Sequence, residues 1–363
     1  MGNKKQIRSL QGWRAIMMFV VVMGHLFGIN IIFGGAGEAM SFFFILSGFV
    51  LSLAFGDIFL SLKVNEVQAF VKKRLSKIYP LYIVMLLFCF LMYVGFAFLE
   101  RNSSEILSYI KYLVVDSVLL QAWIPIKEYY MSLNGVAWFL SALMFSYVMF
   151  IPTNFVVNKI KNKSFKMIYF AMALVLINLV VYELVCKNGG VHQYFTYVFP
   201  IYRYLEFTVG MFLAEIFKEN RETKTSKMTY TVVEIAIIVY FIVEYIVGDI
   251  FSSKFGFNGI ISLVQLFVMC TLIYVFSFEK GLVSKIISNK LFLAFASISF
   301  EVYLIHQAFQ NAIGAVLSRL GLPQLTGIVT VIATLAMAVL WKKITIIVKE
   351  RKQHRGLNGI HYT

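Results

Sequence analysis

The chain has 363 residues, of which 60% are hydrophobic and only 14% are charged, and its mean hydropathy is +0.79. Because soluble proteins average about a quarter charged residues, this composition excludes a soluble domain and indicates an all-α protein that crosses a membrane many times. The formal net charge of +15 fits basic cytoplasmic loops better than nucleic-acid binding. The three cysteines, Cys89, Cys186 and Cys270, lack metal-ligand spacing, so neither a metal nor a bound cofactor is expected.

Ten apolar stretches have the roughly 17–25 residues that a membrane-spanning helix needs. The first, residues 10–31, contains Arg14 near one end and His25 well inside it. The other nine are 38–55, 78–99, 136–153, 167–186, 200–217, 229–248, 259–277, 291–313 and 325–343. The longest outer connection, residues 100–135, contains a further helix expected at the membrane interface. No linker or repeat divides the chain, so residues 1–363 are predicted to form a single membrane domain.

The basic residues between these stretches predict the orientation of the chain. With the N-terminus placed in the cytoplasm, the cytoplasmic segments hold 25 of the 33 Lys and Arg residues, and the outer segments hold 6. Positive residues accumulate in cytoplasmic loops. Both termini are therefore predicted to lie in the cytoplasm, with the protein in the cytoplasmic membrane.

Ionisable side chains inside membrane spans are costly and mark candidate functional sites. Arg14 and His25 are 11 residues apart, so they share one helix face and lie about 16 Å apart along the axis. Arg74 and Lys77, at the start of the third span, fall near the cytoplasmic level of Arg14. A second polar layer is expected in the outer half of the membrane, made of His25, Trp138, Arg203, Glu206, Glu301 and His306.

Each of these residues also has a purely structural interpretation. His25 can bridge two helices as a neutral ring, and Arg14 can anchor its helix at the interface. Arg74 and Lys77 can be ordinary cytoplasmic charge. Arg203 and Glu206 can form an intrahelical ion pair. Glu301 and His306 can link their helix to its neighbours.

Six blocks, in order along nearly the whole chain, resemble the membrane acyltransferase 3 family. The first is "RSLQGWRAIMMFVVVMGHL", which has that family's arginine and histidine, separated by ten residues, at Arg14 and His25. "SFFFILSGFVLS" resembles its FF-x-x-SGF motif, and "RLSKIYPLY" resembles its Arg-x-x-Arg followed by Tyr-Pro. "WFLSALMFSYV", "FPIYRYLEFTVGM" and "SISFEVYLIHQ" follow. Two departures are Lys77, which keeps the second arginine's charge but not its bidentate pairing, and Glu301, where a small polar residue is more common.

The resemblance implies an enzyme that moves an acyl group, usually acetyl from cytosolic acetyl-CoA, across the membrane onto a hydroxyl of an extracytoplasmic glycan or glycoside. It implies acyl-CoA as a donor substrate and the lipid bilayer as surroundings, with no nucleic-acid partner. Some members carry an extra extracytoplasmic hydrolase-like domain. None is expected in this chain, which leaves room for separate envelope-synthesis partners.

Candidate roles follow from the layers and the resemblance together. Arg14, Arg74 and Lys77 are expected to hold the CoA phosphates, with Ser47 near the donor and Gly48 allowing close helix packing. His25 is expected to act as general base on the acceptor hydroxyl or as a transient acyl carrier, and the sequence does not choose between these roles. Glu206 or Glu301 is expected to orient or charge-balance a histidine. The residues expected to shape the acceptor site are Trp138, Arg203, Glu301, Tyr303 and His306.

Two other functional classes stay open. A transporter or exporter of polysaccharide precursors would also have many spans with buried charges, although the sequence has none of the repeats or broken helices typical of transporters. A non-catalytic subunit of a cell-envelope synthesis complex would have no need of Arg14 and His25 in lipid. The sequence therefore favours an O-acetyltransferase and leaves its acyl group and acceptor open.

Overall fold

The computed structural model describes residues 6–29, 35–57, 64–160, 162, 164, 194–222, 224–255 and 258–358. Within these residues the regular secondary structure is helical throughout, as predicted. The span predicted at residues 167–186 lies outside the described residues.

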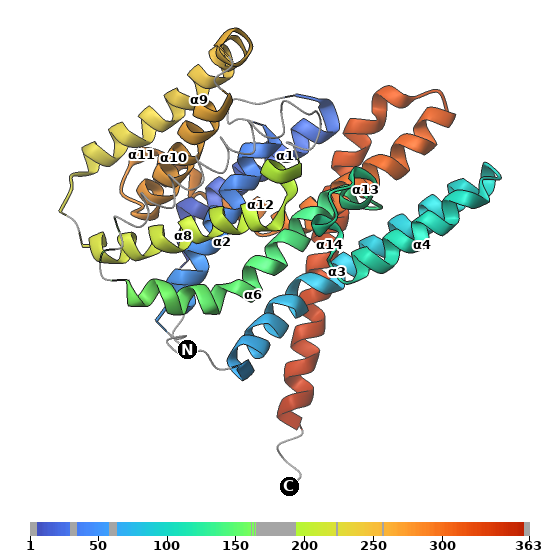
Figure 1. Ribbon diagram of the computed structural model, residues 1–363, viewed down its shortest axis with the longest axis horizontal. Coiled ribbons are helices and arrows are strands. Elements are labelled where there is room, and N and C mark those ends of the chain that lie inside the picture. The colour runs from blue at the N-terminus through green and yellow to red at the C-terminus, as the bar shows by residue number, and fades with distance from the viewer. Residues whose placement is uncertain are drawn as a thin grey trace.

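The long helices pack as a bundle in which α1 and α2 lie centrally, between α9 and α10 on one side and α13 and α14 on the other (Figure 1). The long helices are α1 (Arg8–Phe27), α2 (Ala36–Phe55), α3 (Val64–Leu99), α4 (Ser103–Ser117), α6 (Trp138–Lys159), α8 (Pro200–Asn220), α9 (Lys227–Phe255), α10 (Asn258–Ser277), α13 (Ser299–Arg319) and α14 (Thr326–Asn358). The short helices between them are η1 (Gln121–Trp123), α5 (Lys127–Tyr130), η2 (Gly135–Ala137), η3 (Tyr194–Val198), α11 (Leu282–Ile287), α12 (Lys290–Ala296) and η4 (Pro323–Leu325).

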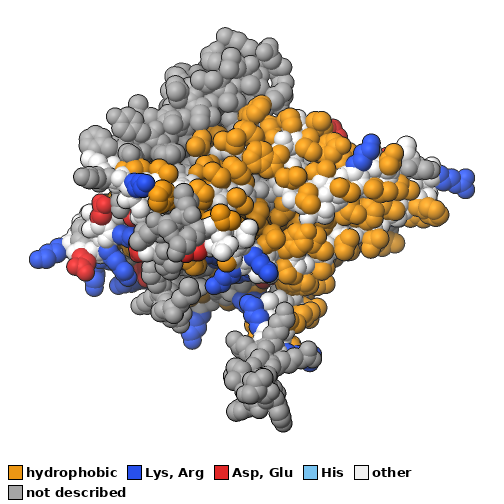
Figure 2. Space-filling view, turned by 60° about the horizontal axis from the view of Figure 1, so that its bottom comes forward, with side chains coloured by type: hydrophobic (Ala, Val, Ile, Leu, Met, Phe, Trp, Pro, Cys, Tyr) orange, Lys and Arg blue, Asp and Glu red, His pale blue; other side chains and the backbone are white. Residues whose placement is uncertain are grey.

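Several of these helices are long and apolar enough to cross a membrane. In the described part of the chain there are six such helices, which are α1, α2, α3, α6, α9 and α14, and a seventh candidate is the bent pair α12 and α13. Helix α10 adds a shorter apolar stretch, Val264–Ser277. Helix α8 contains five charged residues and is buried along most of its length by other helices. Figure 2 shows hydrophobic side chains over a broad continuous area of one face, as a multi-pass membrane protein requires.

Two helix boundaries differ from those of the predicted spans. The third predicted span covers residues 78–99 with Arg74 and Lys77 at its entry, whereas α3 begins at Val64, so both residues lie inside the helix. The predicted span 291–313 is broken into α12 and α13, which meet at an angle of 59°. At this break Ser299 Oγ donates to the carbonyl of Ala296, and such a local side-chain bond competes with a continuous helix. The break brings the first turn of α13 to the level of Arg14.

Helices α2 and α8 cross in backbone contact through two glycines. A Cβ atom added to Gly48 would lie 1.8 Å from the carbonyl oxygen of Phe207, and one added to Gly210 would lie 1.9 Å from that of Ile45. Only glycine at both positions lets the two backbones approach this closely. The close-packing role expected for Gly48 is confirmed.

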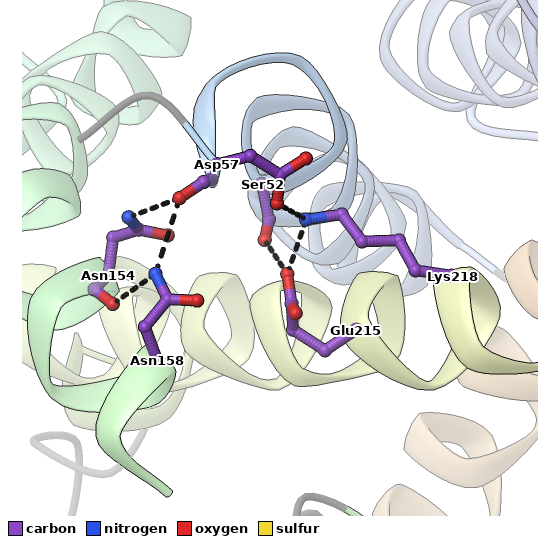
Figure 3. A network of polar contacts seen from close by, with 7 residues as sticks. Ser52, Asp57, Asn154, Asn158, Glu215 and Lys218 are labelled. Atoms are coloured by element: carbon purple, nitrogen blue, oxygen red, sulfur yellow. Dashed lines mark hydrogen bonds and ion pairs between the residues drawn. The ribbon is translucent and has the colours of Figure 1, made fainter. Parts of the chain in front are cut away.

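A polar network fixes the end of α2 to α6 and α8 (Figure 3). Lys218 of α8 donates to the carboxylates of Asp57 and Glu215, at 2.8 and 2.7 Å. Two asparagine amides of α6 donate to the carbonyl oxygen of Gly56, at 3.0 and 3.2 Å. Because these bonds satisfy the carbonyl and the charges at the end of α2, they fix the three helices at the same end as Arg74.

Candidate functional site

His25 in α1 and His306 in α13 form a hydrogen-bonded pair. His25 Nδ1 lies 2.8 Å from His306 Nε2, the ring planes differ by 6°, and the ring centroids are 5.1 Å apart. The centroid separation equals the N···N distance plus half a ring width on each side, which is possible only if both nitrogens lie on the line between the ring centres. The two rings therefore meet edge to edge in a common plane, which is the geometry of a straight N–H···N bond. His25 is half-buried, whereas His306 is 0% exposed.

A small cavity lies beside His25. Its volume is about 40 Å³, which is room for roughly three water molecules. The ring of His25 forms part of its wall, together with Met40, Trp138, Tyr303 and Gln307. Since Nδ1 of His25 is bonded to His306, Nε2 is the ring nitrogen left to face a molecule in the cavity. The predicted residues Trp138 and Tyr303 thus lie with His25, and His306 lies directly behind it.

The turn η2 closes the cavity and is fastened to α13. The Val136 N–H donates to Gln307 Oε1 at 2.8 Å, and the Tyr303 hydroxyl donates to the Val136 carbonyl at 2.6 Å. The Asn134 side-chain amide adds a 2.9 Å bond to the Leu304 carbonyl. These bonds hold the wall opposite His25 in one position. They also orient Gln307, because an N–H group can bond only to the oxygen of its amide.

Asp116, in α4 and outside the candidate membrane-spanning helices, supports the same wall. It is 1% exposed, and burial raises the pKa of its carboxyl group to about 8. Ser132 Oγ lies 2.9 Å from both carboxyl oxygens and 2.5 Å from the carbonyl of Tyr129. The Ser132 hydroxyl is the donor in these contacts, shared between the carboxyl group of Asp116 and the carbonyl of Tyr129. This buried cluster is adjacent in sequence to Met131, which also lines the cavity.

Arg203 and Glu206 of α8 form the intrahelical ion pair that their spacing allowed, with Nη1 and Oε2 2.8 Å apart and both side chains almost fully buried. Ser41 of α2 donates to Glu206 at 2.8 Å and accepts from Arg203 at 3.0 Å. Arg203 Nε donates to the carbonyl of Tyr197 at 2.6 Å, and its guanidinium lies 5.7 Å from the ring centre of Trp138. Glu206 is thus bonded to Arg203 and Ser41, whereas the ring of His25 is bonded to His306. The ion pair supports two residues of the cavity wall.

Arg14 lies at the beginning of α13. Its guanidinium donates to Gln11 Oε1 at 2.8 Å and to Ser299 Oγ at 3.3 Å. Both partners are neutral, and Glu301 is a carboxylate within electrostatic range of the guanidinium. Ser299 is the first residue of α13, and a helix N-terminus adds partial positive charge.

Arg74 lies among aromatic rings on the same side of the molecule. Its guanidinium carbon is 5.0 Å from the ring centres of both Phe55 and Phe70, and 5.9 Å from that of Tyr147. Its buried Nε has no hydrogen-bond partner among the described residues. Tyr147 lies within electrostatic range of both Arg74 and Arg14, and so near two of the three residues expected to bind the donor.

Lys77 completes this group, which we call the cation cluster: Arg14, Arg74 and Lys77. Lys77 is exposed and within electrostatic range of the other two, and of Glu301. Glu301 was expected to shape the acceptor side, but its charge interactions are with Arg14, Lys77 and Lys342, and the break before α13 places it in that helix's first turn. Ser47 is half-buried on α2 beside Gly48.

Comparison with protein-family models gives one match. The model of acyltransferase 3, described as an acyltransferase domain, matches residues 7–342, which is nearly the whole chain. The chain belongs to the acyltransferase 3 family. With its apolar helices, this makes it a multi-pass membrane acyltransferase. Searches of curated proteins and of solved structures found no match.

Sequence reasoning missed several side chains at the sites of this acyltransferase, among them Met40, Met131, Tyr147, Tyr197 and Gln307. Tyr147 and Gln307 lie within quoted blocks, "WFLSALMFSYV" and "SISFEVYLIHQ", but neither was assigned a role. Met131 and Tyr197 come from connections outside the predicted spans. The one available signal was the position of Gln307 directly after His306. A pocket wall made by loops has no periodic pattern to find.

Proposed function

We propose that this acyltransferase moves an acetyl group from cytosolic acetyl-CoA to a hydroxyl group of an extracytoplasmic glycan or glycoside, as an O-acetyltransferase of the cytoplasmic membrane. The proposal keeps the arrangement of ten spans with both termini in the cytoplasm. Its main support is that one helix, α1, contains a cation near the start of α13 and, three turns further on, a histidine in the wall of a cavity. A scaffold needs neither feature.

The cation cluster is proposed to bind the CoA phosphates. None of Arg14, Arg74 and Lys77 has an ion pair with a carboxylate among the described residues. Unpaired cations next to a helix N-terminus make a favourable site for phosphate. The flexible pantetheine arm would then run along α1, over about 16 Å, and bring the thioester to His25.

In the proposed reaction, His25 Nε2 takes the proton of the acceptor hydroxyl while the hydroxyl oxygen attacks the thioester carbonyl carbon. A C–O bond forms and the C–S bond breaks. The proton on His25 then passes to the departing CoA sulfur, so the products are the O-acetylated glycan and CoA with a free thiol. In the second route, Nε2 itself attacks the carbonyl carbon and the acceptor hydroxyl displaces the imidazole, its proton going to the CoA thiolate.

The proposed activity is tested with membranes that contain the protein and the envelope glycans of its own host. Acetyl-CoA labelled in the acetyl group is supplied on the cytosolic side, and extracted glycans are analysed by mass and for label that alkali releases. We expect alkali-labile label on glycan, and one acetyl increment that is missing when the protein is absent. Glycan movement with no consumption of acetyl-CoA would instead identify a transporter and overturn the proposal.

Replacing Arg74 with glutamine is expected to raise KM for acetyl-CoA about tenfold or more while changing kcat much less. A cation that only holds the donor contributes to ground-state and transition-state binding alike, and its loss removes charge-assisted bonds to phosphate. The matched control is Lys73→Gln, because Lys73 is an exposed cation on the same helix. Initial rates at varied acetyl-CoA give both constants. An unchanged KM would remove Arg74 from the donor site.

A further inference from the structure

The hydrogen bonds of His306 determine where its proton is. His306 Nδ1 lies 2.8 Å from the carbonyl oxygen of Tyr303 and 3.1 Å from that of Val302. A carbonyl oxygen can only accept. Nδ1 of His306 must therefore carry a hydrogen, which it shares between the two carbonyls.

The neutral form of His306 then has its lone pair on Nε2. The ring is completely buried, and no described carboxylate lies within ion-pair distance to balance a positive charge. A buried charge without a partner is strongly unfavourable, so the resting ring is neutral. A neutral imidazole has one N–H group, and that group is already at Nδ1.

The lone pair on His306 fixes the proton of His25 in turn. The contact of 2.8 Å between His306 Nε2 and His25 Nδ1 needs one donor. Since Nε2 of His306 accepts, Nδ1 of His25 donates. The lone pair of His25 is consequently on Nε2, the nitrogen that is free to act in the cavity.

We propose that His306 is a positioning residue, which holds His25 in the one tautomer that can act on the acceptor. This rests on the proposed function, in which Nε2 of His25 takes the hydroxyl proton. Once Nε2 is protonated, the cationic ring still donates from Nδ1 to His306, and a hydrogen bond from a charged donor is stronger than one from a neutral donor. His306 thus stabilises the charge that develops on His25 during the reaction.

A simpler role for His306 would be to fasten α13 to α1. That task has another contributor, because the Gln310 side-chain amide donates to the backbone carbonyl of His25 at 2.9 Å. Any side chain of similar size at position 306 would also hold α13 against α1. The positioning role requires a hydrogen-bond acceptor there, and this difference makes the two roles separable.

The test compares His306→Gln with His306→Phe, using labelled acetyl-CoA and host membranes. Glutamine puts an amide oxygen near the position of Nε2, where it can accept from His25, whereas phenylalanine fills the space without accepting. We expect the phenylalanine variant to have a kcat about 100-fold below that of the parent, with KM for acetyl-CoA unchanged. The glutamine variant should have a kcat at least about tenfold higher than that of the phenylalanine variant. Asn311→Ala is the control, since Asn311 bonds to Tyr93 on the other side of α13 and should leave kcat within about threefold of the parent.

Equal losses in the glutamine and phenylalanine variants, or a phenylalanine variant within about threefold of the parent, would overturn the positioning role. A second measurement does not need activity. In purified protein labelled with ¹⁵N-histidine, the ring nitrogens of His25 are assigned by their loss in His25→Gln. We expect Nδ1 protonated and Nε2 unprotonated in the parent, and a mixture of tautomers in His306→Phe. A proton on Nε2 in the parent overturns the inference even if acetyl transfer is normal, whereas the expected tautomer without any transfer contradicts the proposed function alone.

Discussion

Replacing His25 with alanine is expected to lower kcat for acetyl transfer by about 10²–10⁴-fold, the range that a positioned general base contributes. Its imidazole ring lines the cavity, and among the described residues its Nδ1 is bonded to His306 while its Nε2 has no hydrogen-bond partner. KM for acetyl-CoA should change little, because the three residues proposed to hold the phosphates are unaltered, and Arg14, the one on α1, lies three turns away from His25. The measurement is the initial rate of label transfer to glycan at varied acetyl-CoA.

Gln310→Ala is the matched control for this variant. It removes a hydrogen bond to the backbone carbonyl of His25 without touching the imidazole ring, so its kcat should stay within about threefold of the parent. If the His25→Ala protein labels glycan as fast as the parent, the histidine is only a bridge between α1 and α13. The catalytic proposal would then be wrong.

An experiment without acceptor also distinguishes the two chemical routes proposed for His25. Without acceptor, a transient acyl carrier accumulates label on the protein in a single-turnover burst, whereas a general base leaves the label on CoA. We expect the burst to be absent from the His25→Ala protein in either case. A burst in the parent protein that maps to His25 would select the covalent route.

The shared helix face of Arg14 and His25 could be predicted because both residues lie on the same helix. Their spacing alone puts both on one helix face, and no other part of the chain needs to be known. The partner of His25 could not be predicted in the same way. His306 is 281 residues away, and periodicity tells which face of a helix is polar but not which helix packs against that face.

The misplacement of Glu301 has a definite physical cause. A hydropathy pattern joins residues 291–313 into one span, which puts Glu301 ten residues inside it and next to the histidine level. The break between α12 and α13 starts a new helix at Ser299, so Glu301 lies in the first turn, near the cation cluster. The hydropathy pattern also placed the beginning of α3 too late, because a hydropathy window does not detect an amphipathic extension of a helix such as the one that contains Arg74 and Lys77.

The ion pair of α8 illustrates a second limit. Spacing allowed Arg203 and Glu206 to pair, but it left a catalytic role for Glu206 equally open. The hydrogen bonds from Ser41 and Arg203 decide how the carboxylate is used in the resting structure. Such bonds depend on the close approach of α2 and α8, which in turn depends on two glycines.

Replacing Gly48 with alanine is expected to prevent the protein from folding, or to destabilise it by more than about 4 kcal/mol. The added Cβ would lie 1.8 Å from a backbone carbonyl oxygen of α8, and backbone cannot rotate away as a flexible side chain can. Relief requires the two helices to separate along their whole contact. The measurements are the yield of monodisperse protein in detergent and the thermal midpoint of what is recovered.

Gly95→Ala is the control that isolates packing from helix propensity. Gly95 lies inside α3, and an added Cβ meets nothing within 4 Å, so alanine should be neutral or stabilising by up to about 1 kcal/mol. A Gly48→Ala protein with the parent's yield and thermal midpoint would show that α2 and α8 are further apart than described. Any folded fraction should also lose acetyl transfer, because separating these helices pulls Ser41 away from Arg203, the residue that bonds to Tyr197 and supports the cavity wall beside His25.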